Sequence, residues 1–95
     1  MRNYEIMYIL RADLDEAARA NEMEKVHQLL TSNGAEIKKV DESLGLRDLA
    51  YEIKDEKKGY YVVLEVSAGD AALNELNRKV RHNPNVLRHL VVVHE

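Results

Sequence analysis

The 95-residue sequence contains no cysteine, tryptophan or phenylalanine, one proline and only four glycines. Without cysteine the chain can form neither a disulfide framework nor a thiolate metal site, a composition that fits a reducing compartment. The glycines stand singly, so the sequence has no glycine-rich phosphate-binding loop. We therefore expect no bound cofactor.

The sequence also lacks a long apolar run and an excess of basic residues. No apolar stretch approaches the roughly 20 residues of a membrane-spanning helix, and residues 1–4 lead into a predicted strand and not into a signal peptide. Acidic residues outnumber basic residues by 17 to 14, for a net charge of −3. Because nucleic-acid-binding domains are usually basic, any RNA binding must depend on a local basic patch, on stacking or on a partner that brings positive charge.

Side chains with catalytic or metal-binding chemistry are present, but not in the spacings that such sites need. The four histidines, His27, His82, His89 and His94, follow no HxH or HxxxH pattern. No serine or threonine lies in a nucleophile elbow. Residues 11–15, after the first strand, contain no glycine that would open an acylphosphatase-like anion loop. We predict that the chain is not an enzyme and has no small-molecule substrate.

The sequence does contain a regular succession of strand and helix patterns, which we assign to one domain over residues 1–95. Alternating, β-branched and aromatic side chains predict four strands, at residues 4–10, 35–53 (with a bend at Gly45), 60–66 and 86–93. Apolar residues at intervals of three and four predict two helices, at residues 13–33 and from 67 or 70 to about 81.

Capping residues predict where these helices begin and end. Asp13, with Glu16 three residues later, is the expected N-cap of the first helix, and Gly34 is its expected C-terminal stop. Ser67 or Asp70 is expected to cap the second helix. The order βαββαβ predicts an α+β, ferredoxin-like split βαβ sandwich, with two helices on one face of a four-stranded antiparallel sheet.

The sheet face without helices is predicted to be apolar. Met7 and Ile9 alternate with the helix-facing residues of the first strand, and Tyr61 and Val63 do so in the third. An apolar face exposed to water often marks a partner surface. Two alternatives remain, which are a homodimer interface and apolar residues that serve only strand propensity.

One RNA-binding module with the same topology, the RNA-recognition motif, carries stacking aromatics on its third strand. Residues 58–65 read Lys-Gly-Tyr-Tyr-Val-Val-Leu-Glu. The first three positions match that motif, but the later aromatics do not. The match to this module is therefore weak.

Residues 45–54, Gly-Leu-Arg-Asp-Leu-Ala-Tyr-Glu-Ile-Lys, form a more specific pattern. In a strand, Arg47 and Tyr51 fall on one face with Leu49 and Ile53. Arg47 can contact a phosphate with two hydrogen bonds, and Tyr51 can pack through its ring and hydrogen-bond through its hydroxyl. A plain strand with a surface arginine is the alternative.

The Gly-x-Arg-x-Leu-Ala-Tyr-x-Ile-Lys pattern resembles the signature of the bacterial S-six family of small-subunit ribosomal proteins. The opening residues 1–10, residues 30–37 at the end of the first helix and residues 86–92 in the last strand are similar to the corresponding parts of that family. The four stretches occur in the right order and cover essentially the whole chain.

This resemblance implies a non-enzymatic, cytoplasmic ribosomal protein that binds central-domain RNA of the small subunit beside a small basic partner of the S-eighteen family. By position it implies seven RNA-binding residues: Arg2, Tyr4, Arg47, Tyr51, Lys54, Arg88 and His94. The three arginines are expected on one rim of the protein, where they would contact phosphates. Met7, Ile9, Tyr61 and Val63 are the expected partner surface. Because Asp48 replaces a residue that is often basic in the family, the alternative is a diverged or engineered scaffold that folds but binds RNA weakly or not at all.

Overall fold

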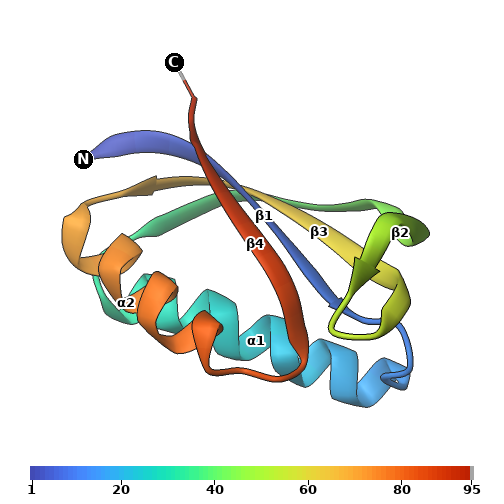
Figure 1. Cartoon of the computed structure of the whole chain (residues 1–95). Helices are drawn as coiled ribbons and strands as arrows, with labels where there is room; N and C mark the ends of the chain where they lie inside the picture. Colours follow the sequence, from blue (N-terminus) through green and yellow to red (C-terminus); the bar gives the residue numbers. More distant parts are fainter. Residues whose placement is uncertain (95) are drawn as a thin grey trace.

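A computed structural model of the chain describes residues 1–94 and contains six elements. In chain order they are β1 (Arg2–Arg11), α1 (Glu16–Ser32), β2 (Glu36–Ile53), β3 (Glu56–Ala68), α2 (Asp70–Arg81) and β4 (Val86–Val93). The strands form one antiparallel sheet in the order β2-β3-β1-β4. Both helices cover the same face of this sheet, as Figure 1 shows. These features confirm the predicted ferredoxin-like split βαβ sandwich.

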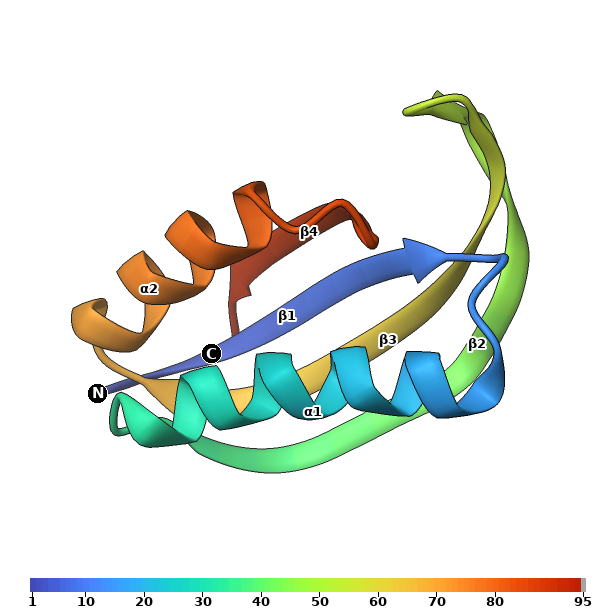
Figure 2. The ribbon, with the colours of Figure 1, turned by 90° about the horizontal axis from the view of Figure 1, so that it is seen from below.

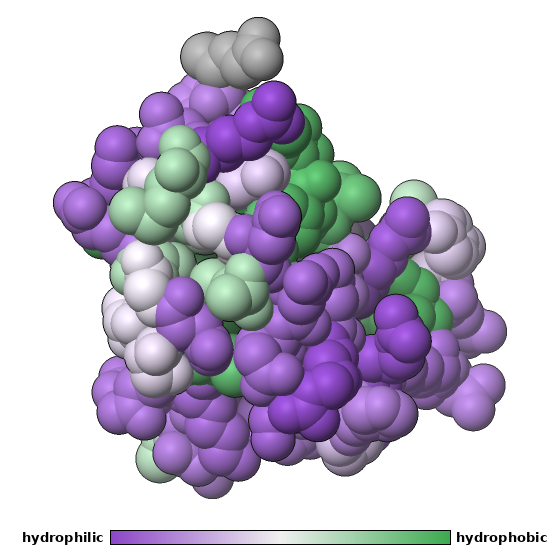
Figure 3. Space-filling view, turned by 90° about the vertical axis from the view of Figure 1, so that its left-hand side faces the viewer, coloured by the Kyte–Doolittle hydropathy of each residue, from purple (hydrophilic) through white to green (hydrophobic). Residues whose placement is uncertain are grey.

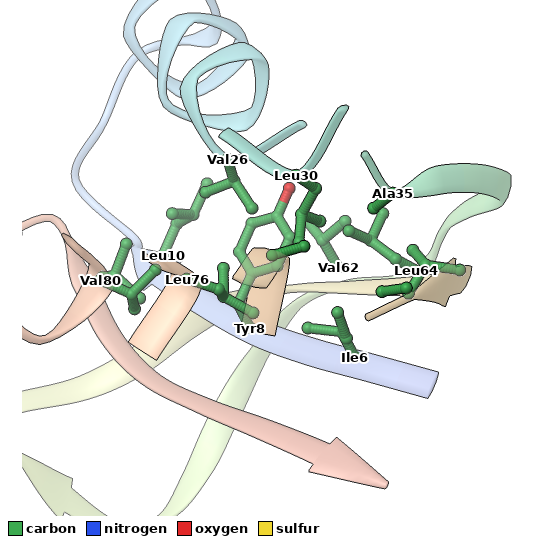
Figure 4. Packing of buried hydrophobic residues seen from close by; sticks show 14 residues of the cluster. Ile6, Tyr8, Leu10, Val26, Leu30, Ala35, Val62, Leu64, Leu76 and Val80 are labelled. Carbon is green, nitrogen blue, oxygen red and sulfur yellow. The ribbon is translucent and has the colours of Figure 1, made fainter. Parts of the chain in front are cut away.

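The hydrophobic core lies between the sheet and the two helices. The even-numbered residues of β1 and β3 face the helices, and most of them are buried. On α2 the buried residues are Ala72, Leu76 and Val80. Figure 4 shows Ile6, Tyr8 and Leu10 of β1 packed beneath Val26 and Leu30 of α1. The alternation read from the sequence therefore assigns the faces of β1 correctly.

One polar pair lies within this apolar core. The Tyr8 hydroxyl is 3.1 Å from Nε2 of His27 on α1. Burial raises the pKa of Tyr8 above its ordinary range and lowers the pKa of His27. Both groups are therefore held neutral at physiological pH, and their hydrogen bond satisfies the polar end of a buried tyrosine.

The N-termini of both helices differ from prediction. Asp15, and not Asp13, is the N-cap of α1, and its side chain accepts a 2.7 Å hydrogen bond from the backbone N–H of Ala18. Asp13 instead receives two hydrogen bonds from the guanidinium of Arg11 at the end of β1. The N-cap of α2 is Gly69, which offers no side-chain hydrogen bond, so neither predicted cap of that helix holds this position.

The C-terminus of α1 ends as predicted. Asn33 is the C-cap, and Gly34 follows with a φ of +91°, in the left-handed region that favours glycine. The backbone N–H of Ala35 returns to the Leu30 carbonyl at 3.0 Å. This closing turn directs the chain into β2.

A buried carboxylate joins α1 to the loop before β4. Glu22 is 5% exposed and accepts hydrogen bonds from the side-chain amides of Asn83 at 2.7 Å and Asn85 at 3.0 Å, and from Lys25 at 3.3 Å. Burial alone would raise the pKa of Glu22, but these hydrogen bonds and the charge of Lys25 together lower it. The ionised carboxylate thus fixes the position from which β4 begins.

The second half of β2 leaves the plane of the sheet. Gly45 has a φ of +57°, and the pairing of β2 with β3 shifts register between Asp41 and Gly45 and again between Asp48 and Ile53. The β2–β3 hairpin turns at residues 54 and 55, so β3 begins at Glu56 and not at the predicted residue 60. In Figure 2 the tip of the hairpin bends round on the side of the sheet where β4 lies. We call residues 49–54 the hairpin arm.

Candidate protein and RNA interface

The sheet face opposite the helices carries an exposed apolar surface. Register places Met7 of β1 directly between Val63 of β3 and Leu90 of β4. Leu90 is 45% exposed and Val92 is 51% exposed, while Met7 and Val63 are half-buried. We call these four residues the open-face patch. It gives the molecule an apolar surface that its own helices do not cover.

One predicted partner residue, Ile9, is not exposed to water. Only 4% of Ile9 is accessible, because the hairpin arm folds back over this end of the open face. A groove of about 260 Å³ separates the arm from β4, and Leu49, Ile53, Tyr61 and Leu90 are among its walls. The expectation of an exposed Ile9 was wrong, since strand alternation carries no information on a distant hairpin tip that folds across the face.

The hairpin arm brings three of the predicted RNA-binding residues together. The Arg88 guanidinium on β4 donates a hydrogen bond to the Tyr51 hydroxyl, and the Lys54 ammonium donates to the Val86 carbonyl at 3.2 Å. These contacts attach the arm to β4, with Arg88 lining the groove and Lys54 at the turn of the hairpin. We call Tyr51, Lys54 and Arg88 the arm cluster.

Arg47 lies in the same half of the molecule but outside this cluster. Arg47 lies on β2, the outer strand of the sheet, in register with Gly59 of β3. Its Nε donates a hydrogen bond to the Leu44 carbonyl at 2.9 Å. Next to it, Lys58 and Asp48 form a loose ion pair at 4.0 Å. Asp48 of the signature stretch thus contacts one of the nearby cations.

The other three predicted RNA-binding residues lie at the opposite end of the sheet. Arg2 pairs with Ala68, whereas Arg88 is opposite Ile9, so roughly 23 Å of β1 separates the two arginines. Tyr4 is half-buried against the core, and Nδ1 of His94 is 3.9 Å from Oε1 of Glu65. The structure therefore does not bring Arg2, Arg47 and Arg88 onto one rim.

The tyrosines of β3 have the wrong phase for an RNA-recognition motif. Tyr60 faces the helix layer, where its ring lies 4.3 Å from the Arg19 guanidinium carbon and its hydroxyl donates to Glu42 at 2.8 Å. Tyr61 alone faces the open side, paired with Ile9. The motif match was weak in sequence, and the side-chain directions now argue against it.

Two carboxylates on the open face were not singled out by sequence reasoning. Glu5 and Glu65 are direct register partners on β1 and β3. Their odd numbers already placed each on the open face, but only the strand register shows that they oppose one another.

Figure 3, viewed from the side of α2 and the chain termini, shows a mainly hydrophilic surface interrupted by a hydrophobic area near the end of β4.

The described part of the chain contains no cluster of side chains suited to a metal ion. Within residues 1–94, no group of three or more histidine, aspartate or glutamate side chains is placed to hold a metal ion. His89 is engaged with Asn77 at 2.8 Å, and burial lowers its pKa, with a smaller contribution from the charge of Arg81. Over the same residues, no helix has the length and apolar character needed to cross a bilayer.

Comparisons with known proteins give a consistent result. A model of the family described as ribosomal protein S6 matches residues 3–93. The small ribosomal subunit protein bS6 of Shouchella clausii is 52% identical over 95 residues, covering 100% of this chain and 99% of that protein. The same protein of Halalkalibacterium halodurans is 48% identical over the same span. The crystal structure of 30S ribosomal protein S6 from Thermotoga maritima superposes with a TM-score of 0.90 at 31% identity, covering 98% of this chain and 87% of that one.

Proposed function

Because the chain belongs to the ribosomal protein S6 family and is thus a structural component of the small ribosomal subunit, we propose that it binds central-domain ribosomal RNA together with a small basic protein of the S-eighteen family. It is not an enzyme, and it works in the cytoplasmic ribosome. The observation that carries the proposal is an exposed apolar sheet face that lies beside two cations, Lys54 and Arg88 of the arm cluster, held in place by hydrogen bonds. These two surfaces suit two different ligands.

The arm cluster and Arg47 are the proposed RNA contacts at the hairpin end. A guanidinium has five N–H donors, and the Tyr51 hydroxyl accepts only one from Arg88, so donors remain for phosphate oxygens. The Lys54 ammonium likewise uses one of its three donors on the Val86 carbonyl. These internal hydrogen bonds hold the cations in place, which lowers the entropy that RNA binding would cost.

Arg2, Tyr4 and His94 form a second proposed RNA contact at the far end of the sheet. The two regions are too far apart for one phosphate group, so they would engage separate segments of RNA. Tyr4 is half-buried, and therefore only its accessible edge is available. We expect Arg2 to contribute most here, because it is exposed and always charged.

The open-face patch, with Tyr61, is the proposed surface for the basic protein partner. Leu90 and Val92 are about half exposed and lie beside Met7 and Val63, so they form a continuous apolar area. Covering such an area removes apolar surface from water and stabilises a complex. Ile9 would take part only if the hairpin arm moves, since the arm buries it in the free protein.

A gel-shift titration with a central-domain fragment of small-subunit ribosomal RNA tests this proposal. We expect a shift mainly when the purified S-eighteen-family protein is also present, because this chain alone has a net charge of −3. The partner alone with the same RNA is the control. No additional shift at low salt on adding this chain would count decisively against RNA binding.

A second candidate is a diverged scaffold that folds but binds RNA weakly or not at all. The contact of Lys58 with Asp48 favours it, because it partly neutralises a cation near Arg47. The substitution Asp48→Arg separates the two candidates. A large gain in RNA affinity on this change, starting from undetectable binding, would support the scaffold; a change of a few fold from measurable binding would support the RNA-binding protein.

A further inference from the structure

We propose that Glu5 and Glu65, together with the open-face patch, form the site that receives a cationic side chain of the basic protein partner. This inference rests on the proposed function and adds to it the chemical determinant of partner choice. The occupant is a segment of basic protein in which a lysine or arginine has an apolar side chain beside it.

The two carboxylates face each other across neighbouring strands. Direct register partners in an antiparallel sheet have Cβ atoms about 4.5–5.5 Å apart, and like charges in such a pair repel. Within residues 1–94, Glu5 forms no ion pair. Glu5 therefore keeps an unfavourable contact with Glu65 that a further positive group would relieve.

Glu65 has some compensation from its own chain. Lys39 of β2 is its register partner on the other side, and Nδ1 of His94 is 3.9 Å from its carboxylate. The Lys38 ammonium, which donates to the side-chain oxygen of Asn3 at 3.3 Å, lines the same surface hollow as Glu65. Glu5 instead has Val92 as its β4 neighbour. Glu5 is consequently the more open of the two carboxylates, on the side of β1 and β4 where apolar residues are also exposed.

The carboxylates and the patch are adjacent, which suits a long cationic side chain. Glu5 and Glu65 each precede or follow a patch residue by two positions on the same strand face, Met7 on β1 and Val63 on β3. The methylene stem of a lysine or arginine can lie along apolar surface while its charged head reaches the carboxylates. A guanidinium could bind both oxygens of one carboxylate.

The distribution of charge on this face favours protein over RNA as the occupant. The acidic pair lies at one end, and Arg88 lies four register positions away along β1, roughly 13 Å distant. RNA phosphates would be repelled by the two carboxylates and attracted to the arm cluster on one side of them and to Arg2 on the other. A basic protein would have the opposite preference, so it can occupy the open face between the two proposed RNA contacts.

The test measures partner affinity for Glu5→Gln, Glu65→Gln and the double variant, by calorimetric titration of the full chain with the purified S-eighteen-family protein. Glu24→Gln is the matched control, because it makes the same change of charge on the exposed face of α1. We expect the double variant to bind about tenfold more weakly, with a smaller salt dependence, and the control to bind within about twofold of the parent.

Thermal unfolding of the isolated variants supplies an independent reading. Relief of like-charge repulsion should leave the melting temperature of Glu5→Gln unchanged or higher, so weaker partner binding cannot then be ascribed to misfolding. Equal partner affinity for the parent and the double variant would overturn the inference and leave the proposed function intact. Stronger RNA binding by the double variant with unchanged partner binding would assign the face to RNA and overturn the inference also. No binding of the partner by the parent chain would instead overturn the proposed function.

Discussion

The two faces of the sheet are built from the same strands but differ in how far their apolar side chains are exposed to water. On the helix-covered face, Ile6, Leu64 and Val66 are at most 1% exposed, and both helices close over them. On the open face, Leu90 and Val92 have similar side chains but stay about half exposed. Apolar residues of one kind therefore stabilise the fold on one face and remain available for a ligand on the other.

Truncation of a leucine on each face should show this difference most clearly. Leu64→Ala removes a fully buried side chain and should lower the free energy of unfolding by roughly 2–5 kcal/mol. Leu90→Ala should lower it by no more than about 0.5 kcal/mol but weaken partner binding. Urea denaturation provides the measurement, and equal losses of stability for the two variants would mean that the open face belongs to the core.

Gly59 tests how closely the hairpin arm fits over the open face. A Cβ atom at this position would lie 2.3 Å from Cγ2 of Ile9 and 3.3 Å from a methyl of Leu49. Gly59→Ala should therefore destabilise the fold by about 1–3 kcal/mol and loosen the arm. Gly69→Ala, where the added atom meets nothing closer than 4.0 Å, should cost less than about 1 kcal/mol. Similar melting temperatures for the two variants would contradict this packing.

Glu22 allows a pH test of the polar anchor on the helix side. Glu22→Gln places an amide donor against the donors of Asn83, Asn85 and Lys25, and should cost about 1–3 kcal/mol at neutral pH. Because the folded-state pKa of Glu22 lies below its ordinary 4.5, its contribution is complete above that pH and is lost as the pH falls through the folded value. The difference between parent and variant should thus be constant from pH 7 to 5 and shrink below about pH 4.5. Chemical denaturation at several pH values measures it; a difference independent of pH would exclude the ionised carboxylate as the cause.

The smallest expected change concerns Arg88. Arg88→Ala should alter stability by no more than about 0.5 kcal/mol, since the side chain is exposed. If it contacts one phosphate, the slope of log affinity against log salt should fall by about 0.7–0.9 in the RNA titration with partner present. Arg81→Ala, an exposed cation on α2, should leave that slope unchanged. Identical slopes for both variants would remove Arg88 from the RNA contact.

Sequence patterns predict the elements of this fold well because they depend on local alternation. The order of strands and helices, the faces of β1 and the stop at Gly34 follow from neighbouring residues alone. The cap of α1 does not, since the capping-box spacing favours Asp13, whose side chain instead binds Arg11 and leaves the N-cap position to Asp15. Local patterns therefore do not determine which residue caps a helix when a side chain from a neighbouring strand competes for one of the candidates.

The candidate sites depend still more on distant contacts. The burial of Ile9 results from an arm some 40 residues later in the chain, and the opposition of Glu5 to Glu65 results from strand register. Tyr4 is different, because strand alternation puts it on the helix-facing side with Ile6 and Tyr8, while the family resemblance implied a contact with RNA. For that residue the local pattern was the better guide to its packing.

Hydroxyl-radical footprinting of the chain, read by mass spectrometry, tests the division of the two surfaces most directly. With the S-eighteen-family protein alone, we predict lower modification of Met7 and Leu90 and unchanged modification of Tyr51. Addition of the central-domain RNA fragment should then lower modification of Tyr51 as well. Protection of Leu90 by RNA without the partner, or full modification of Met7 and Leu90 in the partner complex, would contradict the account.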